Sequence, residues 1–358
     1  MKKKKRNNFE VDWQLLGGGL GILMLVGIAI LGAPLKESND TSDAAPLSDA
    51  SFLVSEPVPN VPPFLSGIWS EENTDSYPVA VVIDNLDVSR PQAGLDKAPL
   101  VYETLAEGGI TRFLAVFSSA DDILKIGPVR SARPYFIDLA IEHRAAFAHS
   151  GGSPEALARL QAGTDAVLNL DEFAWGNFFF RDRKRVAPHN LYISADLLRN
   201  ALAERKRFDV QSLSPWVWSE VLENSDELAS AGTITIPFSN GIGYTVTWKF
   251  DESIGMWTRR YNGNEHRAAD GSPVQASTIV VQWTKMEILD DVGRRAIAIV
   301  GSGKAVVFRD GVAIPGRWEK TSKSVRTRVY TDTGEEISFA PGKVWVEIVN
   351  EGTDIFFE

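Results

Sequence analysis

Hydrophobic and polar positions along the chain follow either the period of a strand, about 2 residues, or that of a helix, about 3.6 residues. The first half of the chain contains both patterns. Residues 78–85 (PVAVVIDN), 100–109 and 111–119 are apolar and β-branched, as buried strands are, and Gly108-Gly109 marks a turn. Segment 145–153 indicates a further strand that ends in a glycine loop. Helical spacing predicts helices over residues 134–144, 153–161 and 194–208, the last two beginning at the N-cap residues Ser153 and Ser194. Strands alternating with helices predict an α/β domain with a mixed sheet over residues 77–210.

The second half shows only the strand period. Short alternating segments such as TITIPFS (233–239) and YTVTWKF (244–250) follow one another after about residue 230. Turns separate them, at Asn262-Gly263, Asp310-Gly311 and Thr333-Gly334. We therefore expect an all-β-rich second domain over residues 231–358, joined to the first by a connector, residues 211–230.

One hydrophobic segment is long enough for a membrane helix. Residues 13–33 (WQLLGGGLGILMLVGIAILGA) carry no charge, and 21 residues at helical rise span a bilayer core. The basic residues of segment 1–12 predict a cytoplasmic tail and an extracytoplasmic body. A cleaved signal peptide is the alternative, but Pro34 makes LGAP a poor cleavage site and we favour a single-pass membrane anchor. Residues 34–76, rich in Pro, Ser and acidic residues, predict a disordered extracytoplasmic linker.

Composition narrows the classes of function. The net charge of −10 leaves no broad basic surface, so we do not expect nucleic acid as a partner. The chain has no cysteine, which excludes disulfides, thiolate nucleophiles, cysteine zinc sites and lipid attachment to an N-terminal cysteine. The four histidines match no metal-binding spacing, so we predict neither a metal site nor a cofactor.

Arginine is the first sign of a binding site. Residues 77–192 contain nine arginines and three lysines, and arginine is the residue that favours bidentate recognition of carboxylate or phosphate. Arg130 and Arg133 directly precede the helix expected from Pro134, and free N–H groups at a helix N-terminus attract anions. The alternative is that these arginines pair with carboxylates of the same segment, which holds Asp84, Glu103, Glu107 and Asp138.

Two loops add polar side chains. AHSGGSPEA (148–156) runs from the end of a strand through a glycine turn into a helix. This pattern is typical of a nest of backbone N–H groups that binds an anion, or of a tight turn without a ligand. RDRKRVAPHNLYIS (181–194) combines a basic run with histidine, asparagine and tyrosine, and a histidine near Asp84 is a candidate base. The candidate ligand-binding residues are Asp84, Asn85, Arg90, Arg112, Arg130, Ser131, Arg133, His149, Ser150, Ser153, Arg185, His189, Asn190 and Tyr192.

Several of these motifs together resemble a known family. VAVVIDN, KIGPVRSARPYFIDLA, AHSGGSPEA and APHNLYIS, with RRYNGNEH and VGSGKAVVFRDGVAIPGRWEK further on, are similar to the YerB-like family of bacterial extracytoplasmic proteins. The resemblance covers about residues 77–350. It implies an exported, envelope-associated protein with an α/β domain followed by a β-rich domain, and it implies no reaction. Some members are lipoproteins, whereas this chain lacks the lipid-bearing cysteine.

Three functions remain open. The first is a binding or regulatory module at the cell envelope that holds an anionic partner such as peptidoglycan, an anionic wall polymer or a wall-synthesis protein. The second is a hydrolase or transferase, with an arginine-lined anion site and His149 or His189 as a base near Asp84. The third is a scaffold in which each arginine is already paired with a carboxylate of the protein.

Overall fold

The structure is a computed structural model that describes residues 65–68, 77–118, 122–165, 167–205, 214–223, 225–238 and 244–358. The predicted tail (1–12), the predicted anchor (13–33) and nearly all of the predicted linker (34–76) lie outside these ranges. Within these ranges, no helix has both the length and the apolar character that a membrane span requires.

The first half forms the elements that its pattern predicts. β1 (Pro78–Asp84), β2 (Leu100–Leu105) and β3 (Thr111–Ser118) are buried antiparallel neighbours, with β3 in the middle. Gly108 and Gly109 have φ values of 65° and 73° in the turn before β3, a left-handed conformation that glycine adopts without steric cost. The predicted strands and their turn are therefore confirmed.

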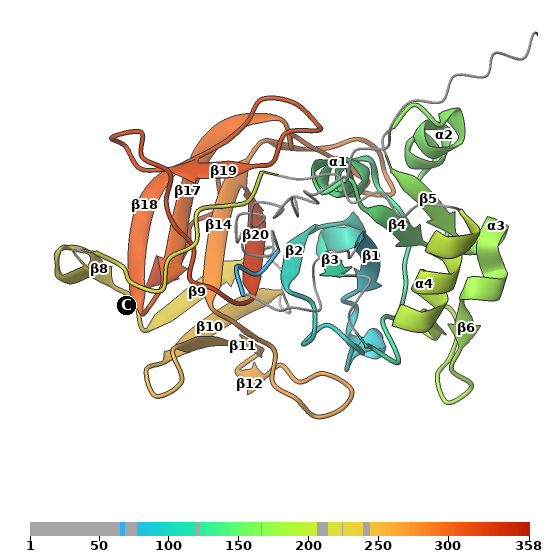
Figure 1. The fold of residues 1–358 in the computed structure, drawn as a ribbon, viewed down its shortest axis with the longest axis horizontal. Helices are drawn as coiled ribbons and strands as arrows, with labels where there is room; N and C mark the ends of the chain where they lie inside the picture. Colours follow the sequence, from blue (N-terminus) through green and yellow to red (C-terminus); the bar gives the residue numbers. More distant parts are fainter. Residues whose placement is uncertain are drawn as a thin grey trace, which may run out of the picture. The chain divides into compact units, whose positions relative to one another are not determined.

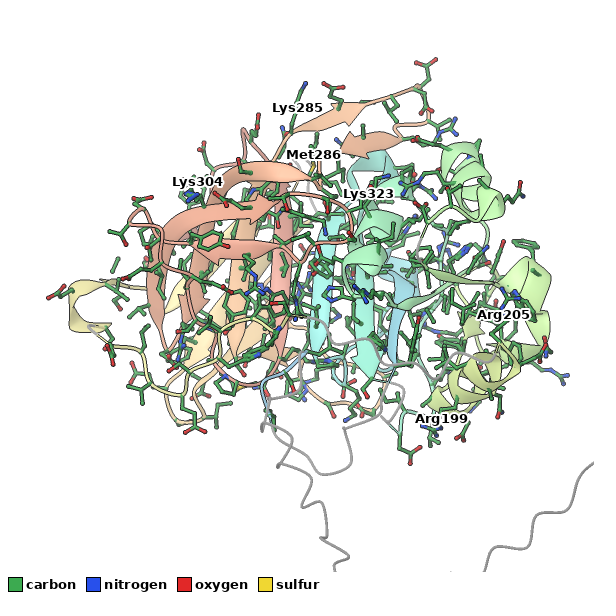
Figure 2. All side chains as sticks on the ribbon, turned by 45° about the horizontal axis from the view of Figure 1, so that its top comes forward. Arg199, Arg205, Lys285, Met286, Lys304 and Lys323 are labelled. Carbon is green, nitrogen blue, oxygen red and sulfur yellow. The ribbon has the colours of Figure 1, made fainter. Side chains whose placement is uncertain are left out.

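The helices also begin where the sequence indicates. α1 (Pro134–Glu142), α2 (Pro154–Ala162) and α4 (Ala195–Glu204) are the three predicted helices. Ser153 and Ser194 cap α2 and α4. The side-chain oxygen of each serine accepts a hydrogen bond from the backbone N–H three residues later in the sequence. Arg199 of α4 and Arg205, which follows the last residue of α4, lie on the outer side of the molecule (Figure 2). The Arg205 guanidinium lies 4.8 Å from the centre of the Trp175 ring.

The strand expected within residues 145–153 is present, and several other short elements of this half have no clear sequence signal. β4 (Ala146–His149) and β5 (Leu168–Asp171) extend the sheet in parallel beyond β1. α3 (Glu172–Trp175) follows β5 directly, and the remaining short elements are η2 (Asp87–Ser89), η3 (Glu107–Gly109), η4 (Gly176–Phe178), β6 (Phe180–Arg181) and β7 (Leu191–Tyr192).

The second half is strand-rich, as its period predicts. Its longer strands are β9 (Thr233–Pro237), β10 (Thr245–Asp251), β11 (Met256–Tyr261), β14 (Thr278–Thr284), β17 (Gly301–Arg309), β18 (Val312–Lys320) and β20 (Val344–Asn350). The shorter elements are η5 (Ser225–Glu227), β8 (Ala229–Ser230), β12 (Asn264–Glu265), β13 (Gln275–Ala276), β15 (Met286–Ile288), β16 (Arg295–Ile297), β19 (Arg328–Tyr330) and β21 (Phe356–Phe357).

One mixed sheet runs through both halves of the chain. Its main path has the order β19-β18-β17-β14-β20-β2-β3-β1-β4-β5 (Figure 1). β20 pairs in parallel with β14 on one side and with β2 on the other, so the last long strand joins the two halves. The strand-rich second part is therefore continuous with the sheet of the first part, an arrangement that hydrophobic periods alone do not reveal.

A second sheet and the helices cover the two faces of this large sheet. The six-stranded sheet, with the path β12-β11-β10-β9-β21, packs its buried face on the face that also contacts α4. Trp248 of β10 meets Trp345 of β20 edge to face, with ring centroids 5.2 Å apart. α1 and α2 lie on the opposite face, against a separate apolar cluster that also contains Trp216 and Phe339.

Candidate functional site

The carboxyl ends of three neighbouring parallel strands meet at one edge of the sheet. β1, β4 and β5 lie side by side and end at Asp84, His149 and Asp171. In open α/β sheets this edge is where ligands bind, because the loops that follow the strands converge there. Asp84 and His149, which the sequence predicts as ligand-binding residues in two separate motifs, thus lie at one edge of the sheet, which we call the polar edge.

The segment 126–130 brings two further loops to this edge. It runs between the end of β1 and the strand β7, and it hydrogen-bonds with the backbone on both sides. Arg130 is placed beside Asp84 in this way, and His189, two residues before β7, arrives from the other side. The backbone bonds are Asp84 N to Pro128 O (2.9 Å), Arg130 N to Val82 O (2.9 Å), Val129 N to Leu191 O (2.7 Å) and Ile126 N to Ile193 O (2.7 Å).

Asp84, His189 and Arg130 form a compact cluster, which we call the Asp84 cluster. His189 Nδ1 lies 2.7 Å from Asp84 Oδ2, and Arg130 Nε lies 3.1 Å from the same oxygen. The Arg130 contact is an ion pair without hydrogen-bond geometry at Nε. The Asp84 side chain is 4% exposed, whereas His189 is 17% and Arg130 22% exposed. A buried carboxylate therefore holds a histidine and an arginine that both reach solvent.

A second group of polar side chains lies beside this cluster. Ser150 Oγ donates to Glu172 Oε2 over 2.7 Å, and Arg181 binds the other oxygen of that carboxylate. Arg181 also donates to the Asn190 side chain over 3.0 Å, which fixes the residue next to His189. Since Ser150 N donates to Arg130 O over 3.0 Å, the two groups share a backbone frame.

His149 is held inside the fold. Its Nδ1 is hydrogen-bonded with Gly151 O (2.8 Å) and its Nε2 with Asn169 Oδ1 (2.7 Å), and the side chain is buried. With both ring nitrogens engaged, His149 shapes the glycine loop. Of the two histidines predicted as candidate bases, His189 is the one that reaches solvent beside a carboxylate.

Arg112 and Arg133 pair with one carboxylate of the fold. Arg133 Nε donates to Glu107 Oε1, and Arg112 Nη2 lies 3.4 Å from Glu107 Oε2. Burial alone would raise the pKa of Glu107, but the Arg133 hydrogen bond and the charges of both arginines hold it below its usual value. Arg112 also donates to Ser131 O over 3.2 Å, so both arginines brace the entry to α1.

The remaining predicted residues support the loops around β1. Asn85 donates to Thr111 Oγ1 (2.7 Å) and accepts from Arg90 Nε (3.0 Å). Arg185 donates to Ser89 O (2.7 Å) and to the Tyr192 hydroxyl (2.9 Å). These contacts fix the distance between the β1 loop and the loop that carries His189.

Two buried ionic clusters escaped the sequence reading. Glu103 and Glu347 are directly opposite each other on the parallel strands β2 and β20, and both are fully buried. Arg259 of β11 donates to both oxygens of Glu103, over 2.9 and 2.8 Å. Burial and the charge of Glu103 raise the pKa of Glu347 well above its usual value. Each of the apolar segments LVYETL and KVWVEIV contains one glutamate, and a glutamate in a strand pattern of this kind is the sequence signal that indicates a buried carboxylate.

The second cluster lies on the opposite face, and we call it the Glu142 cluster. Glu142 at the end of α1 pairs with Lys320 of β18, and both side chains are fully buried. His143 Nε2 lies 2.8 Å from the Tyr102 hydroxyl, which also binds Glu142. Burial lowers the pKa of His143 to about 4, so this histidine is neutral at pH 7. Thr327 completes the cluster with a 2.9 Å bond to Glu142.

No group of three or more metal-binding side chains occurs among the residues that the structure describes. The Asp84 cluster contains one carboxylate and one histidine, and Arg130 puts a positive charge where a cation would have to bind.

Comparison with known proteins gives consistent matches. Residues 65–209 match the family model described as "Protein of unknown function (DUF3048) N-terminal domain", and residues 234–346 match the corresponding C-terminal domain. The chain is 34% identical over 289 residues to "Putative lipoprotein YerB" of Bacillus subtilis (strain 168), covering 80% of this chain and 85% of that protein. The crystal structure of YerB from Bacillus subtilis superimposes with a TM-score of 0.72 at 31% identity, over 82% of this chain and 98% of that one.

Proposed function

Because this chain belongs to the YerB-like family, with DUF3048 N- and C-terminal domains, we propose that it is a membrane-anchored extracytoplasmic protein that binds an anionic envelope ligand at the Asp84 cluster. The family predicted from the sequence motifs is confirmed by these matches. The relative's name as a lipoprotein supports the membrane-anchored, extracytoplasmic location. With no cysteine in this chain, segment 13–33 stays our prediction for the anchor.

One observation carries the binding proposal: two potential donors meet on one buried carboxylate and remain accessible. Asp84 Oδ2 contacts His189 Nδ1 and Arg130 Nε. Among the described residues, His189 Nε2 and the Arg130 Nη atoms have no hydrogen-bond partner, so they are available to a ligand. A guanidinium that is already oriented loses less freedom on binding a phosphate or carboxylate.

The proposal is tested with the full-length chain in detergent micelles. Phosphate, muropeptides and anionic wall polymers are added, and the shift in melting temperature is measured for wild type and Arg130→Ala. We expect a ligand that stabilises the wild type and stabilises the variant much less. Arg133→Ala is the matched control, because Arg133 is bound to Glu107; it should melt earlier and keep the full ligand shift. Equal shifts for wild type and Arg130→Ala would contradict the proposal.

A second candidate function is general-base chemistry on an envelope substrate. A carboxylate at Nδ1 fixes the tautomer of an imidazole and directs Nε2 to act as the base, and the 2.7 Å contact from His189 to Asp84 has this arrangement. Arg130 would then stabilise negative charge on the reacting group. Turnover of a muropeptide or wall polymer that disappears in His189→Ala but survives in Arg133→Ala would favour this candidate over simple binding.

A further inference from the structure

A series of buried polar side chains connects the strand-rich part of the protein to the Asp84 cluster. It begins at Arg259 of β11, passes through His266 and Gln92, and ends at the backbone of Asp84. Arg259, His266 and Gln92, which we call the Gln92 bridge, are each at most 5% exposed. Arg259 and His266 belong to the second family-matched part of the protein, whereas Gln92 and Asp84 belong to the first. The bridge therefore joins the two parts at the end of β1.

The donor at each step of the bridge follows from the guanidinium of Arg259. A guanidinium can only donate, so the imidazole accepts in the 2.7 Å contact of Arg259 Nη1 with His266 Nδ1. A neutral imidazole that accepts at Nδ1 carries its proton at Nε2. Burial and the charge of Arg259 hold the pKa of His266 well below its usual value, which agrees with a neutral ring. His266 Nε2 therefore donates to Gln92 Oε1 over 2.9 Å.

The hydrogen bond from His266 fixes the direction of the Gln92 amide. Because Oε1 accepts from the imidazole, the amide nitrogen faces the end of β1. Gln92 Nε2 donates to Asp84 O over 3.0 Å and to Asn85 Oδ1 over 3.1 Å. A flipped amide would turn its oxygen toward two acceptors and its nitrogen toward a donor, so only the observed direction satisfies all of these groups.

A second contact of Arg259 holds Asn85, the residue that follows Asp84. Arg259 Nη2 donates to the Glu103 carboxylate, and Asn85 Nδ2 donates to Oε1 of the same carboxylate over 3.2 Å. The peptide between Asp84 and Asn85 is thus held at its carbonyl by Gln92 and through the Asn85 side chain by Glu103. Both connections start at Arg259, in the strand-rich part of the protein.

The position of this peptide determines where the Asp84 carboxylate lies. Asp84 Oδ1 accepts from the backbone N–H of Leu86 over 3.1 Å, while Oδ2 contacts His189 and Arg130. If the peptide moves, Oδ2 moves with it. A hydrogen bond such as the 2.7 Å contact between Asp84 and His189 weakens steeply when its length and angle leave the optimum. The Gln92 bridge can therefore act on His189 without touching it.

We propose that Gln92 and His266 are positioning residues for the Asp84 cluster, so that the strand-rich part of the protein sets the geometry of the site at the end of β1. The importance of that geometry for a ligand rests on the anion binding proposed above. The geometry itself is present without a ligand and can be measured separately.

The test observes the His189 ring in the full-length chain in detergent micelles, with no ligand added. Labelling with 15N-histidine gives signals from four rings, and the signal that is missing in His189→Gln belongs to His189. The rate at which its Nδ1 proton exchanges with water measures how firmly Asp84 holds the ring. Gln92→Met keeps the length of the side chain and removes its polar atoms, so we expect exchange at least about fivefold faster than in wild type.

Two substitutions of His266 separate positioning from general support of the fold, and they decide the question even if Gln92→Met does not fold. His266→Gln places an amide near the position of Nε2 and can still donate to Gln92, so exchange should stay within about twofold of the wild-type rate. His266→Asn places its amide near the position of Nδ1. It can accept from Arg259 but does not reach Gln92, so exchange should be as fast as in Gln92→Met.

Thr327→Val is the matched control, because Thr327 is buried in the Glu142 cluster on the opposite face. This variant loses its bond to Glu142 and should leave the His189 exchange rate unchanged. An unchanged rate in Gln92→Met, or an equal increase in Thr327→Val, would overturn the proposal. Equal rates in His266→Gln and His266→Asn would overturn the step through His266.

These outcomes are independent of the anion-binding test, because the exchange rate is measured without a ligand. The expected rates together with a failure of every anion to bind would refute the proposed function and support the positioning role. Anion binding that depends on Arg130, together with an unchanged rate in Gln92→Met, would support the proposed function and refute the positioning role.

Discussion

Two clusters among the residues that the structure describes each bring a histidine and a carboxylate together beside a basic side chain, and the two differ in burial. In the Glu142 cluster, Glu142, His143 and Lys320 are fully buried. In the Asp84 cluster the carboxylate is buried, while His189 and Arg130 reach solvent. The same residue types thus join elements of the fold in one place and remain available to a ligand in the other. Burial, more than residue type, distinguishes a structural ion pair from a candidate site.

The largest effect should follow from breaking the buried pair. Lys320→Met leaves the Glu142 charge without its partner, and we expect a loss of about 3–5 kcal/mol in the free energy of unfolding. Urea unfolding of the full-length chain measures it. The double variant Glu142→Gln/Lys320→Met should be more stable than Lys320→Met alone, and a loss below about 1 kcal/mol in the single variant would show that the buried pair is not what distinguishes the two clusters.

Acidification should act through the same cluster. Since the pKa of His143 is about 4 in the fold and about 6.5 when unfolded, the unfolded chain binds this proton first as the pH falls. Stability should therefore decrease from pH 6.5 to pH 4, by at most about 3 kcal/mol from this group. The measurement is unfolding at several pH values, and His143→Gln should have a shallower slope over that window. An equal slope in the variant would assign the acid sensitivity to other groups.

Removing the arginine that braces α1 should have a smaller effect. Arg133→Ala leaves Glu107 with Arg112 only, and we expect about 1–2 kcal/mol of destabilisation. Thermal unfolding checks this, with Arg130→Ala as the comparison at the polar edge. If Arg130→Ala proved the more damaging of the two, the assignment of structural and ligand-facing arginines would have to be reversed.

The smallest change in stability is expected at the exposed histidine. His189→Ala removes one partner of Asp84, but the side chain is partly in solvent, and we expect a loss of less than about 1 kcal/mol. Chemical denaturation measures this loss, and folded protein from the same preparation serves for the anion-binding assay. A loss comparable to that in Lys320→Met would place the Asp84 cluster among the structural pairs.

Local features of the fold were predictable from the sequence because local interactions determine them. The strand that ends at Asp84, the serine caps of α2 and α4 and the glycine turn before β3 depend on residues close to one another in the sequence. The turns at Asn262-Gly263 and Asp310-Gly311 have positive φ at both positions, as two-residue hairpins require. The polar edge was predictable in part, because parallel strands present their carboxyl ends together.

The remaining features depend on contacts between distant segments. Nothing in the period of residues 344–350 indicates that β20 pairs with β2, because that choice depends on register across about 240 residues. The pairing of Glu142 with Lys320 has the same origin, since the two residues are 178 positions apart. The arginines that pair with a carboxylate of the fold likewise depend on where Glu107 lies, because Glu107 contacts both Arg112 and Arg133.

The position of β20 also constrains how the chain can be made and exported. The strand is synthesised after every other strand of the large sheet, yet it fills the centre of that sheet between β14 and β2. Until residue 350 is available, β2 lacks its parallel neighbour and has a free edge of backbone N–H and C=O groups. A chain that stalls or is cleaved upstream of β20 cannot complete either half and would expose that edge to aggregation and proteolysis.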